Sequence, residues 1–208
     1  MARNLDSKCR QCRREGEKLF LKGARCDSAK CAIVKRNFQP GVHSWSRGRP
    51  SDYGVRLREK QKLKRYFGVS EKVFRRVVAR ALRLQGNTGQ NILALLQRRL
   101  DHVVNSAGLS LSRRHARQLI AHGHVYVNGK RCDIPSAAVH SGDRITVSTR
   151  EKIRKVVSEA RESRKGEQLP AWLAFEDATL TTSVVEMPRR EHLEFPVDEQ
   201  LVVELMSK

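Results

Sequence analysis

Four cysteines near the start of the chain have the residue type and spacing of a metal site. Two residues separate Cys9 from Cys12 and four separate Cys26 from Cys31, so two close pairs flank a short loop. Four thiolates supplied as two pairs suit the tetrahedral geometry of zinc. A closed four-thiolate site leaves no position for a substrate, so we expect one structural zinc ion that folds a small basic unit.

Two disulfides, a redox pair or unmetallated thiols are the alternatives for these cysteines. The chain shows no secretory signal segment, so we expect a cytoplasmic protein, and disulfides are rare in that reducing compartment. The doubled motif argues against a simple redox pair. The fifth cysteine, Cys132, stands alone and is expected to be a small buried apolar residue.

A second set of candidate functional residues is the group of arginines that follows Ser112. If Ser112 caps a helix, Arg113, Arg114 and Arg117 lie together near the helix N-terminus, with the apolar residues on another face. Free backbone N–H groups and guanidinium groups at such an end suit phosphate oxygens. The apolar face would comprise Ala116, Leu119 and Ile120.

The chain then changes to a strand pattern. Val125 and Val127 alternate with polar residues, Asn128-Gly129 is typical of a two-residue hairpin turn, and Lys130 and Arg131 follow it. A further alternating strand is predicted over residues 144–147. Helix and hairpin together would present one basic surface, which indicates an RNA-binding module.

Composition supports an anionic partner. The chain has 42 Lys and Arg against 22 Asp and Glu, a net charge of +20, with +17 in residues 1–90, +6 in residues 91–150 and −3 in residues 151–208. No long apolar segment predicts a membrane span. Aromatic residues make up only 5%, too few for base-stacking platforms, so we expect folded RNA recognised through its phosphates and shape.

The remaining elements are mostly helical. Residues 38–52 are predicted to form a loop with two arginines, residues 54–66 a helix, and the segment from Ser70 a second helix. We expect one continuous third helix from Gly89 to near Gly108. Residues 149–165 are predicted to form an exposed helix, and the chain from residue 169 irregular structure ending in an apolar segment, 201–206, that docks on the helices of residues 54–105.

These basic elements extend the set of candidate RNA contacts. Besides the three arginines after Ser112, the candidates are Arg10, Arg13, Arg14, Lys22, Arg47, Arg49, Arg56, Arg58, Lys60, Lys62, Arg65, Lys130 and Arg131.

Motifs in the middle of the chain resemble the RNA-binding domain named after the fourth small-subunit ribosomal protein. They are Arg99-Leu100-Asp101, Ser112-Arg113, Ala116-Arg117-Gln118-Leu119-Ile120, Val127-Asn128-Gly129 and Gly142-Asp143. Motifs elsewhere resemble the bacterial family of that ribosomal protein over nearly the full length. They include Pro40-Gly41, Ser51-Asp52-Tyr53-Gly54-Val55, Gly86-Asn87-Thr88-Gly89, Leu169-Pro170, Trp172-Leu173 and Val203-Glu204-Leu205.

The resemblance implies a primary ribosomal RNA-binding protein that nucleates small-subunit assembly at a helix junction in the 5′ domain. It also implies a place where mRNA enters the subunit, beside ribosomal proteins three and five, and a contribution to translational accuracy. Some family members carry four N-terminal cysteines with zinc, and this chain has the complete set. In the family, the module is inserted into a helical domain.

The expected fold class is therefore α+β, with a small zinc-knuckle unit, a mostly helical domain and an inserted module of helices and a small antiparallel sheet. We expect the zinc-binding basic unit over residues 1–45. The helical domain is predicted over residues 46–95 and 173–208, and the module with its following helix over residues 96–172.

An enzyme is the competing class, because pseudouridine synthases carry a catalytic aspartate in a Gly-Arg-Leu-Asp motif. Here Arg98 occupies the glycine position, and the module follows the motif, which leaves no room for a catalytic domain. We therefore predict no enzymatic activity and expect Asp101 to cap or pair within its helix. A free-standing RNA chaperone or regulator remains an open alternative.

Overall fold

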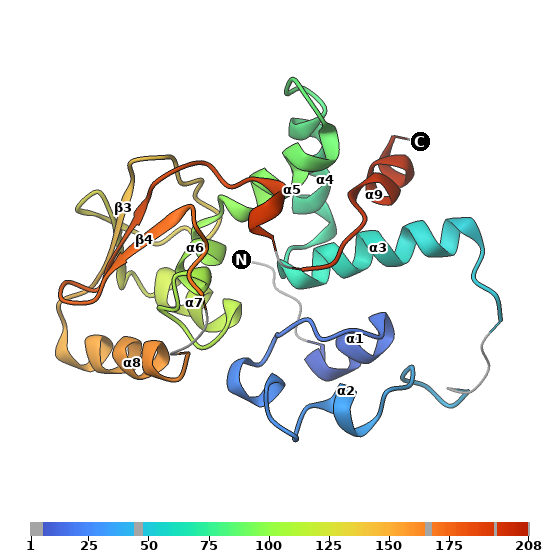
Figure 1. Ribbon diagram of the computed structural model, residues 1–208, viewed down its shortest axis with the longest axis horizontal. Helices are drawn as coiled ribbons and strands as arrows, with labels where there is room; N and C mark the ends of the chain where they lie inside the picture. Colours follow the sequence, from blue (N-terminus) through green and yellow to red (C-terminus); the bar gives the residue numbers. More distant parts are fainter. Residues whose placement is uncertain (1–5, 44–47, 165–167, 194, 208) are drawn as a thin grey trace. The chain divides into compact units, whose positions relative to one another are not determined.

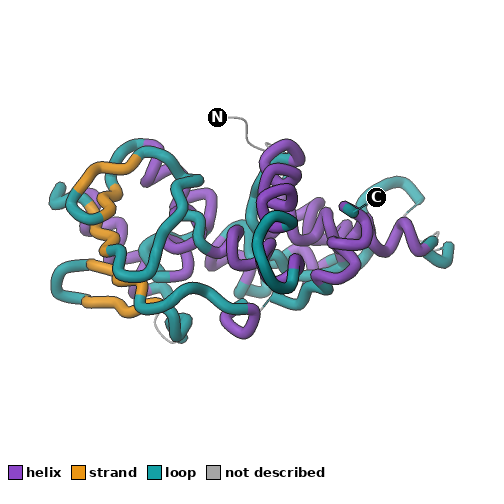
Figure 2. Tube along the Cα trace, turned by 90° about the horizontal axis from the view of Figure 1, so that it is seen from above, coloured by secondary structure: helices purple, strands orange, loops and turns teal. Residues whose placement is uncertain are grey.

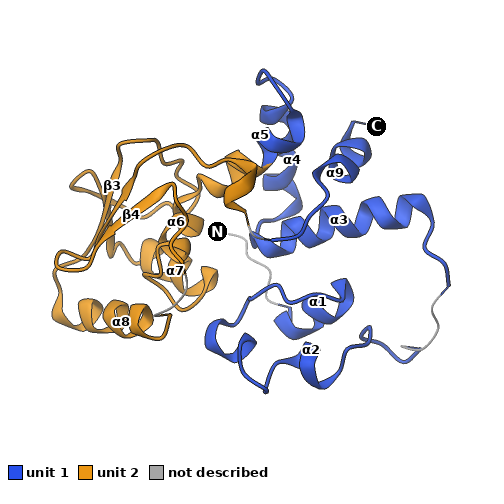
Figure 3. Cartoon of the chain, in the orientation of Figure 1, with its two compact units in different colours: residues 1–92, 195–208 blue, residues 93–194 orange. Residues whose placement is uncertain are grey.

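The computed structural model describes residues 6–43, 48–164, 168–193 and 195–207, which form helices and one five-stranded sheet (Figure 1). The chain divides into two compact units (Figure 3). Unit 1 comprises residues 1–92 and 195–208, and unit 2 comprises residues 93–194. The α+β class is thus confirmed.

Unit 1 is helical. Its elements are α1 (Lys8–Glu15), the 3₁₀ helix η1 (Gly23–Cys26), α2 (Ala32–Lys35), α3 (Asp52–Tyr66), α4 (Glu71–Ala81), the first part of α5 (Thr88–Gln97) and α9 (Glu199–Met206). Helix α9 packs along the long helix α3, so the predicted docking of the apolar C-terminal segment on that helix is confirmed (Figure 1).

Serine caps fix the starts of the two longest helices of unit 1. The Ser51 hydroxyl accepts a hydrogen bond from the Gly54 N–H at the start of α3, and Ser70 accepts one from Val73 at the start of α4. Such caps satisfy N–H groups that have no partner inside the helix. The sequence predicted both helices, and α3 begins two residues earlier than expected.

Unit 2 contains α6 (Leu100–Ser106), α7 (Arg113–Ala121), α8 (Glu151–Glu162), the 3₁₀ helix η2 (Arg190–His192) and the sheet. Its strands are β1 (Val125–Val127), β2 (Lys130–Cys132), β3 (Arg144–Val147), β4 (Leu173–Glu176) and β5 (Thr181–Val184). They lie in the order β2-β1-β3-β5-β4, and every neighbouring pair is antiparallel. Figure 2 shows the strands in orange. One apolar core joins this sheet to α6, α7 and α8.

The predicted helix, turn and strand of the module are confirmed. Ser112 accepts a hydrogen bond from the His115 N–H, at 3.3 Å, and caps α7. Asn128 and Gly129 both have positive φ, 51° and 76°, as a type I′ turn between β1 and β2 requires.

The continuous helix predicted over residues 89–108 is wrong. Arg99 has an extended conformation and separates α5 from α6. The backbone N–H groups of Leu100 and Asp101 bond to carbonyls of Ala137 and Pro135, so tertiary contacts replace helical ones here. Apolar residues continue at helical spacing across this break, because α5 and α6 each bury an apolar face.

The irregular structure predicted from residue 169 is also wrong at residues 173–184, where β4 and β5 extend the sheet. Ser183 pairs with Arg144 and Thr182 with Ile145, so β5 lies beside β3. Strands of four residues carry weak sequence signals. Because this hairpin joins the sheet, unit 2 extends to residue 194, beyond the end predicted for the module at residue 172.

The side chains of α8 and α4 can be compared with their predicted positions. Helix α8 buries Val157 and Ala160 of its thin apolar stripe and exposes most of its other side chains, as expected. The apolar periodicity after Ser70 predicts that Leu82 lies on the core face of that helix, but in the structure Leu82 lies just after α4 and is 52% exposed. The core face of α4 is formed by Phe74, Val78 and Ala81.

Candidate nucleic-acid interface and cysteine pocket

The start of α7 presents three arginines in different surroundings. Arg114 is exposed, whereas Arg113 and Arg117 are half-buried. Ala116, Leu119 and Ile120 are buried on the opposite side, as predicted. We call Arg113, Arg114 and Arg117, together with Lys130 and Arg131 of the hairpin, the α7–hairpin surface. Within it, Arg114, Lys130 and Arg131 are exposed to solvent.

Asp101 holds the Arg117 guanidinium in place. Its carboxylate accepts bonds of 3.1 and 2.6 Å from Nε and Nη2 of Arg117, and bonds of 3.0 and 2.7 Å from Arg99. The carboxyl side chain is only 5% exposed. The predicted pairing of Asp101 within its own helix is confirmed only for Arg99 at the start of α6, because Arg117 comes from α7.

A buried histidine lies beneath the arginines. Burial lowers the pKa of His102 well below its ordinary value, and the positive charges of Arg113 and Arg99 lower it further. The ring is therefore neutral at physiological pH and approaches the Ser106 hydroxyl at 3.3 Å. The positive charge here belongs to the arginines alone.

The hairpin places Arg131 against the backbone of Gly123. A β-carbon at Gly123, whose φ is +71°, would collide with the Arg131 guanidinium. Burial lowers the pKa of His124, and Arg150, His122 and Arg131 add repulsion. Cations from several segments therefore gather around the base of the hairpin.

The predicted RNA-binding residues of α3 lie in ion pairs. Arg58 and Arg65 both bind the carboxylate of Glu15 on α1, which is 1% exposed. Lys60 and Lys64 bind Glu71 on α4, at 2.7 and 3.0 Å. These side chains join α3 to its neighbouring helices.

The other two candidates of α3 are paired in the same way. Lys62 lies 2.7 Å from Glu59 and 3.5 Å from Glu17, and Arg56 lies 2.6 Å from Glu204 of α9. Most of these partners could not be predicted from the sequence, because the pairs Arg65–Glu15 and Arg56–Glu204 join residues 50 and 148 positions apart.

The candidate RNA-binding residues near the N-terminus include some with intrachain partners and some that are exposed. Arg13 donates to the carbonyl of Phe38 and lies 4.5 Å from the centre of its ring, and Arg14 donates to Gln39. Arg10, Lys22 and Arg49 are exposed. Arg47 lies outside the described residues.

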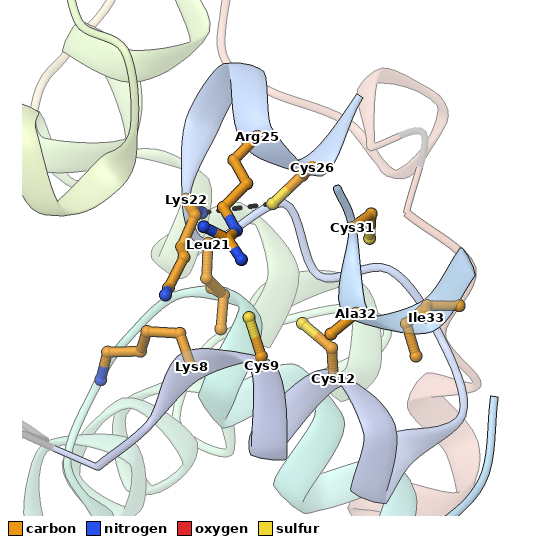
Figure 4. Close-up of a pocket in the computed structure, with 10 residues that line it drawn as sticks. All are labelled: Lys8, Cys9, Cys12, Leu21, Lys22, Arg25, Cys26, Cys31, Ala32 and Ile33. Carbon is orange, nitrogen blue, oxygen red and sulfur yellow. Dashed lines mark hydrogen bonds between the residues drawn. The ribbon is translucent and has the colours of Figure 1, made fainter. Parts of the chain in front are cut away.

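The four N-terminal cysteines line one pocket (Figure 4). Cys9 and Cys12 project from α1 toward Cys26 and Cys31, and all but Cys9 are buried. Burial raises the pKa of Cys12 and Cys26. No group of three or more His, Cys, Asp or Glu side chains in the described part of the chain is arranged to hold a metal ion, so the zinc knuckle is not confirmed.

Among the described helices, none combines the length and apolarity needed to cross a membrane.

Comparison with known proteins covers the whole chain. A family profile described as "Ribosomal protein S4/S9 N-terminal domain" matches residues 3–97, and one described as "S4 domain" matches residues 98–145. The chain is 48% identical to "Small ribosomal subunit protein uS4" of Acetivibrio thermocellus and 50% identical to "Small ribosomal subunit protein uS4A" of Alkaliphilus metalliredigens. Both alignments span 208 residues and all of each chain.

Proposed function

Since the chain belongs to the ribosomal protein uS4 family, we propose that it is a structural, non-enzymatic component of the small ribosomal subunit that binds ribosomal RNA. The observation that carries the proposal is the α7–hairpin surface, which the S4-domain match includes. Three of its cations are exposed, and the whole chain carries a charge of +20. Such a surface suits the phosphates of folded RNA.

We further propose the finer role that the family resemblance implies. The protein would bind a helix junction in the 5′ domain early in subunit assembly, in the cytoplasmic ribosome. It would later lie where mRNA enters, beside ribosomal proteins three and five, and contribute to accuracy. Each of the three predicted domains would contribute to RNA binding, and the unit of residues 1–45 would add a basic surface.

The proposed phosphate contacts begin with the exposed candidates. They are Arg10, Lys22, Arg49, Arg114, Lys130 and Arg131, together with the half-buried Arg113. The candidates whose side chains are held by intrachain partners also remain proposed contacts. They are Arg13, Arg14, Arg56, Arg58, Lys60, Lys62, Arg65 and Arg117. Arg47 is proposed from the sequence alone.

Equilibrium binding to an RNA transcript tests the function. We expect tight binding to a transcript of the small-subunit 5′ domain and at least tenfold weaker binding to a shuffled transcript of equal length. Affinity should fall about 10³-fold or more between 50 and 200 mM salt if at least six phosphates are contacted. Equal binding to both transcripts would favour the chaperone alternative.

The substitutions Arg114→Gln and Lys130→Gln test the α7–hairpin surface. Both side chains are exposed, so the fold should be retained. Each lost phosphate contact lowers the slope of log affinity against log salt by about 0.7–0.9, so we expect a decrease of about 1.5. An unchanged slope would contradict a role for this surface. Asp133→Asn, an exposed site in the same unit, is the control for folding.

We also propose that Cys9, Cys12, Cys26 and Cys31 bind one zinc ion. In support, the two pairs line a single pocket, and thiolates are the ligands that structural zinc prefers. A bound ion would join α1 to the segment of Cys26 and Cys31, which requires loss of the thiol protons.

Metal analysis of protein purified without chelators tests the zinc proposal. We expect one zinc per chain, lost in the variant Cys9→Ser/Cys12→Ser and retained in Cys132→Ser. Metal-free wild-type protein with an unchanged far-ultraviolet spectrum after zinc addition would refute it.

A further inference from the structure

Helix α4 and the turn that follows it carry a row of cations that no site described above includes. Lys72, Arg76 and Arg80 are four residues apart, and Arg83 follows three residues later. Lys72, Arg76 and Arg80 are therefore neighbours on the surface of α4, and Arg83 lies in the turn after its last residue, Ala81. All four are exposed, and we call them the α4 row.

The fold holds this row toward solvent. Phe74, Val78 and Ala81 on the other side of α4 are buried, with exposed fractions of 0–3%. The Ser70 cap fixes the first turn of the helix. Rotation of α4 to hide the cations would therefore expose its apolar face to water, which is unfavourable.

No carboxylate neutralises the row within the part of the chain that the structure describes, where none of its four side chains forms an ion pair or a side-chain hydrogen bond. The one acidic residue of α4, Glu71, is bound by Lys60 and Lys64 of α3. Burial opposes ionisation of Glu71, but the two lysines outweigh it and lower its pKa to about 2. Arg75 makes only a marginal contact of 3.4 Å with Glu71 and is 71% exposed.

Helix α3 differs in this respect. Its cations are bound by carboxylates from α1, α4, α9 and the neighbouring loop, and two of them, Lys60 and Lys62, are buried. Among the described residues of these two adjacent helices, the exposed cations without a carboxylate partner therefore belong to α4. The sequence alone does not distinguish them, because both helices are rich in Lys and Arg.

Mutual repulsion makes this arrangement unfavourable without a partner. Like charges four residues apart destabilise a helix, and the row has two such pairs, Lys72 with Arg76 and Arg76 with Arg80. A polyanion would remove this repulsion. The only aromatic residue of α4, Phe74, is fully buried and cannot stack on bases, so phosphates are the groups that fit the row.

We propose that the α4 row is a second phosphate-binding surface for RNA, separate in sequence from the α7–hairpin surface and located in unit 1. This inference rests on the proposed function and assigns part of the RNA contact to residues outside the S4-domain match.

Matched triple variants of the full-length protein test the proposal. One carries Arg76→Gln, Arg80→Gln and Arg83→Gln. The control carries Lys152→Gln, Arg154→Gln and Lys155→Gln on α8, where three exposed cations lie between Glu151 and Glu159. Both variants lose three positive charges from exposed positions, so thermal unfolding followed by circular dichroism should remain cooperative in each.

Binding of each variant to the 5′-domain transcript is measured from 50 to 200 mM salt. We expect the α4 variant to bind about tenfold or more weakly at low salt, with a salt slope smaller by about 2, and the α8 control to match wild type. Equal slopes for the α4 variant and wild type, while wild type binds specifically, would overturn the inference. An equal loss in both variants would also overturn it, because the effect would then follow net charge alone. Failure of wild type to prefer this transcript would instead refute the proposed function.

Discussion

Asp101 shows how a residue in a catalytic-looking motif serves a structural purpose. The carboxylate receives four hydrogen bonds from the guanidinium groups of Arg99 and Arg117 and is nearly inaccessible to solvent. It links α6 to α7 and orients an arginine of the α7–hairpin surface. The motif could be recognised in the sequence, but its partner on α7 could not, because sixteen residues separate them.

Removal of this carboxylate should destabilise unit 2. Asp101→Ala leaves the largely buried Arg99 guanidinium without its acceptor, and breaking such a pair costs about 3 kcal/mol. Urea unfolding should show this decrease in the free energy of unfolding. The exposed Asp133→Ala should change it by less than about 0.5 kcal/mol. Similar values for the two variants would contradict the structural role of Asp101.

Arg117→Ala should also lower stability, because Arg117 binds the same carboxylate of Asp101 as Arg99 does. We expect a smaller loss than for Asp101→Ala, since Arg99 still binds the carboxylate. Thermal unfolding measures the stability and the salt slope measures the RNA contact. A variant with weaker RNA binding and unchanged stability would show that Arg117 contacts phosphate directly.

At the scale of helices and strands, local sequence signals predicted most elements. The features that they did not predict depend on tertiary contacts. Serine caps and apolar periodicity located α3, α4 and α7, and the Asn128-Gly129 turn located the hairpin. The break at Arg99 and the strands β4 and β5 were missed, because hydrogen bonds to distant segments produce them. The intrachain partners of the α3 cations were missed for the same reason.

The joint between α3 and α4 should depend on pH through Glu71. Lys60 and Lys64 lower its pKa from 4.5 to about 2, against the effect of burial. Its stabilisation is therefore complete above about pH 4.5 and is lost as pH falls toward 2. The difference in free energy of unfolding between wild type and Glu71→Gln should shrink between pH 6 and pH 3.

Glu159→Gln on the exposed face of α8 is the control for this pH dependence. A wild-type advantage over Glu71→Gln that is equal at pH 6 and pH 3 would contradict the lowered pKa of Glu71.

For the whole molecule, charge was the most informative property of the sequence. The excess of +20 predicted a polyanionic partner, and the family membership supports ribosomal RNA as that partner. The sequence could not show which cations are free to bind it. Ion pairs occupy the cations of α3, whereas no carboxylate among the described residues forms an ion pair with the α4 row or the exposed part of the α7–hairpin surface. Which cations remain available to bind RNA depends on side-chain pairing, and the fold determines that pairing.

Binding to small-subunit ribosomal RNA in the cell is best measured by cross-linking the protein to RNA in cells. The attached fragments are then sequenced, and the bound particles are sedimented. We expect fragments from one junction of small-subunit ribosomal RNA, in particles that sediment with the small subunit. Fragments scattered over messenger or transfer RNA, in light fractions without the subunit, would contradict it.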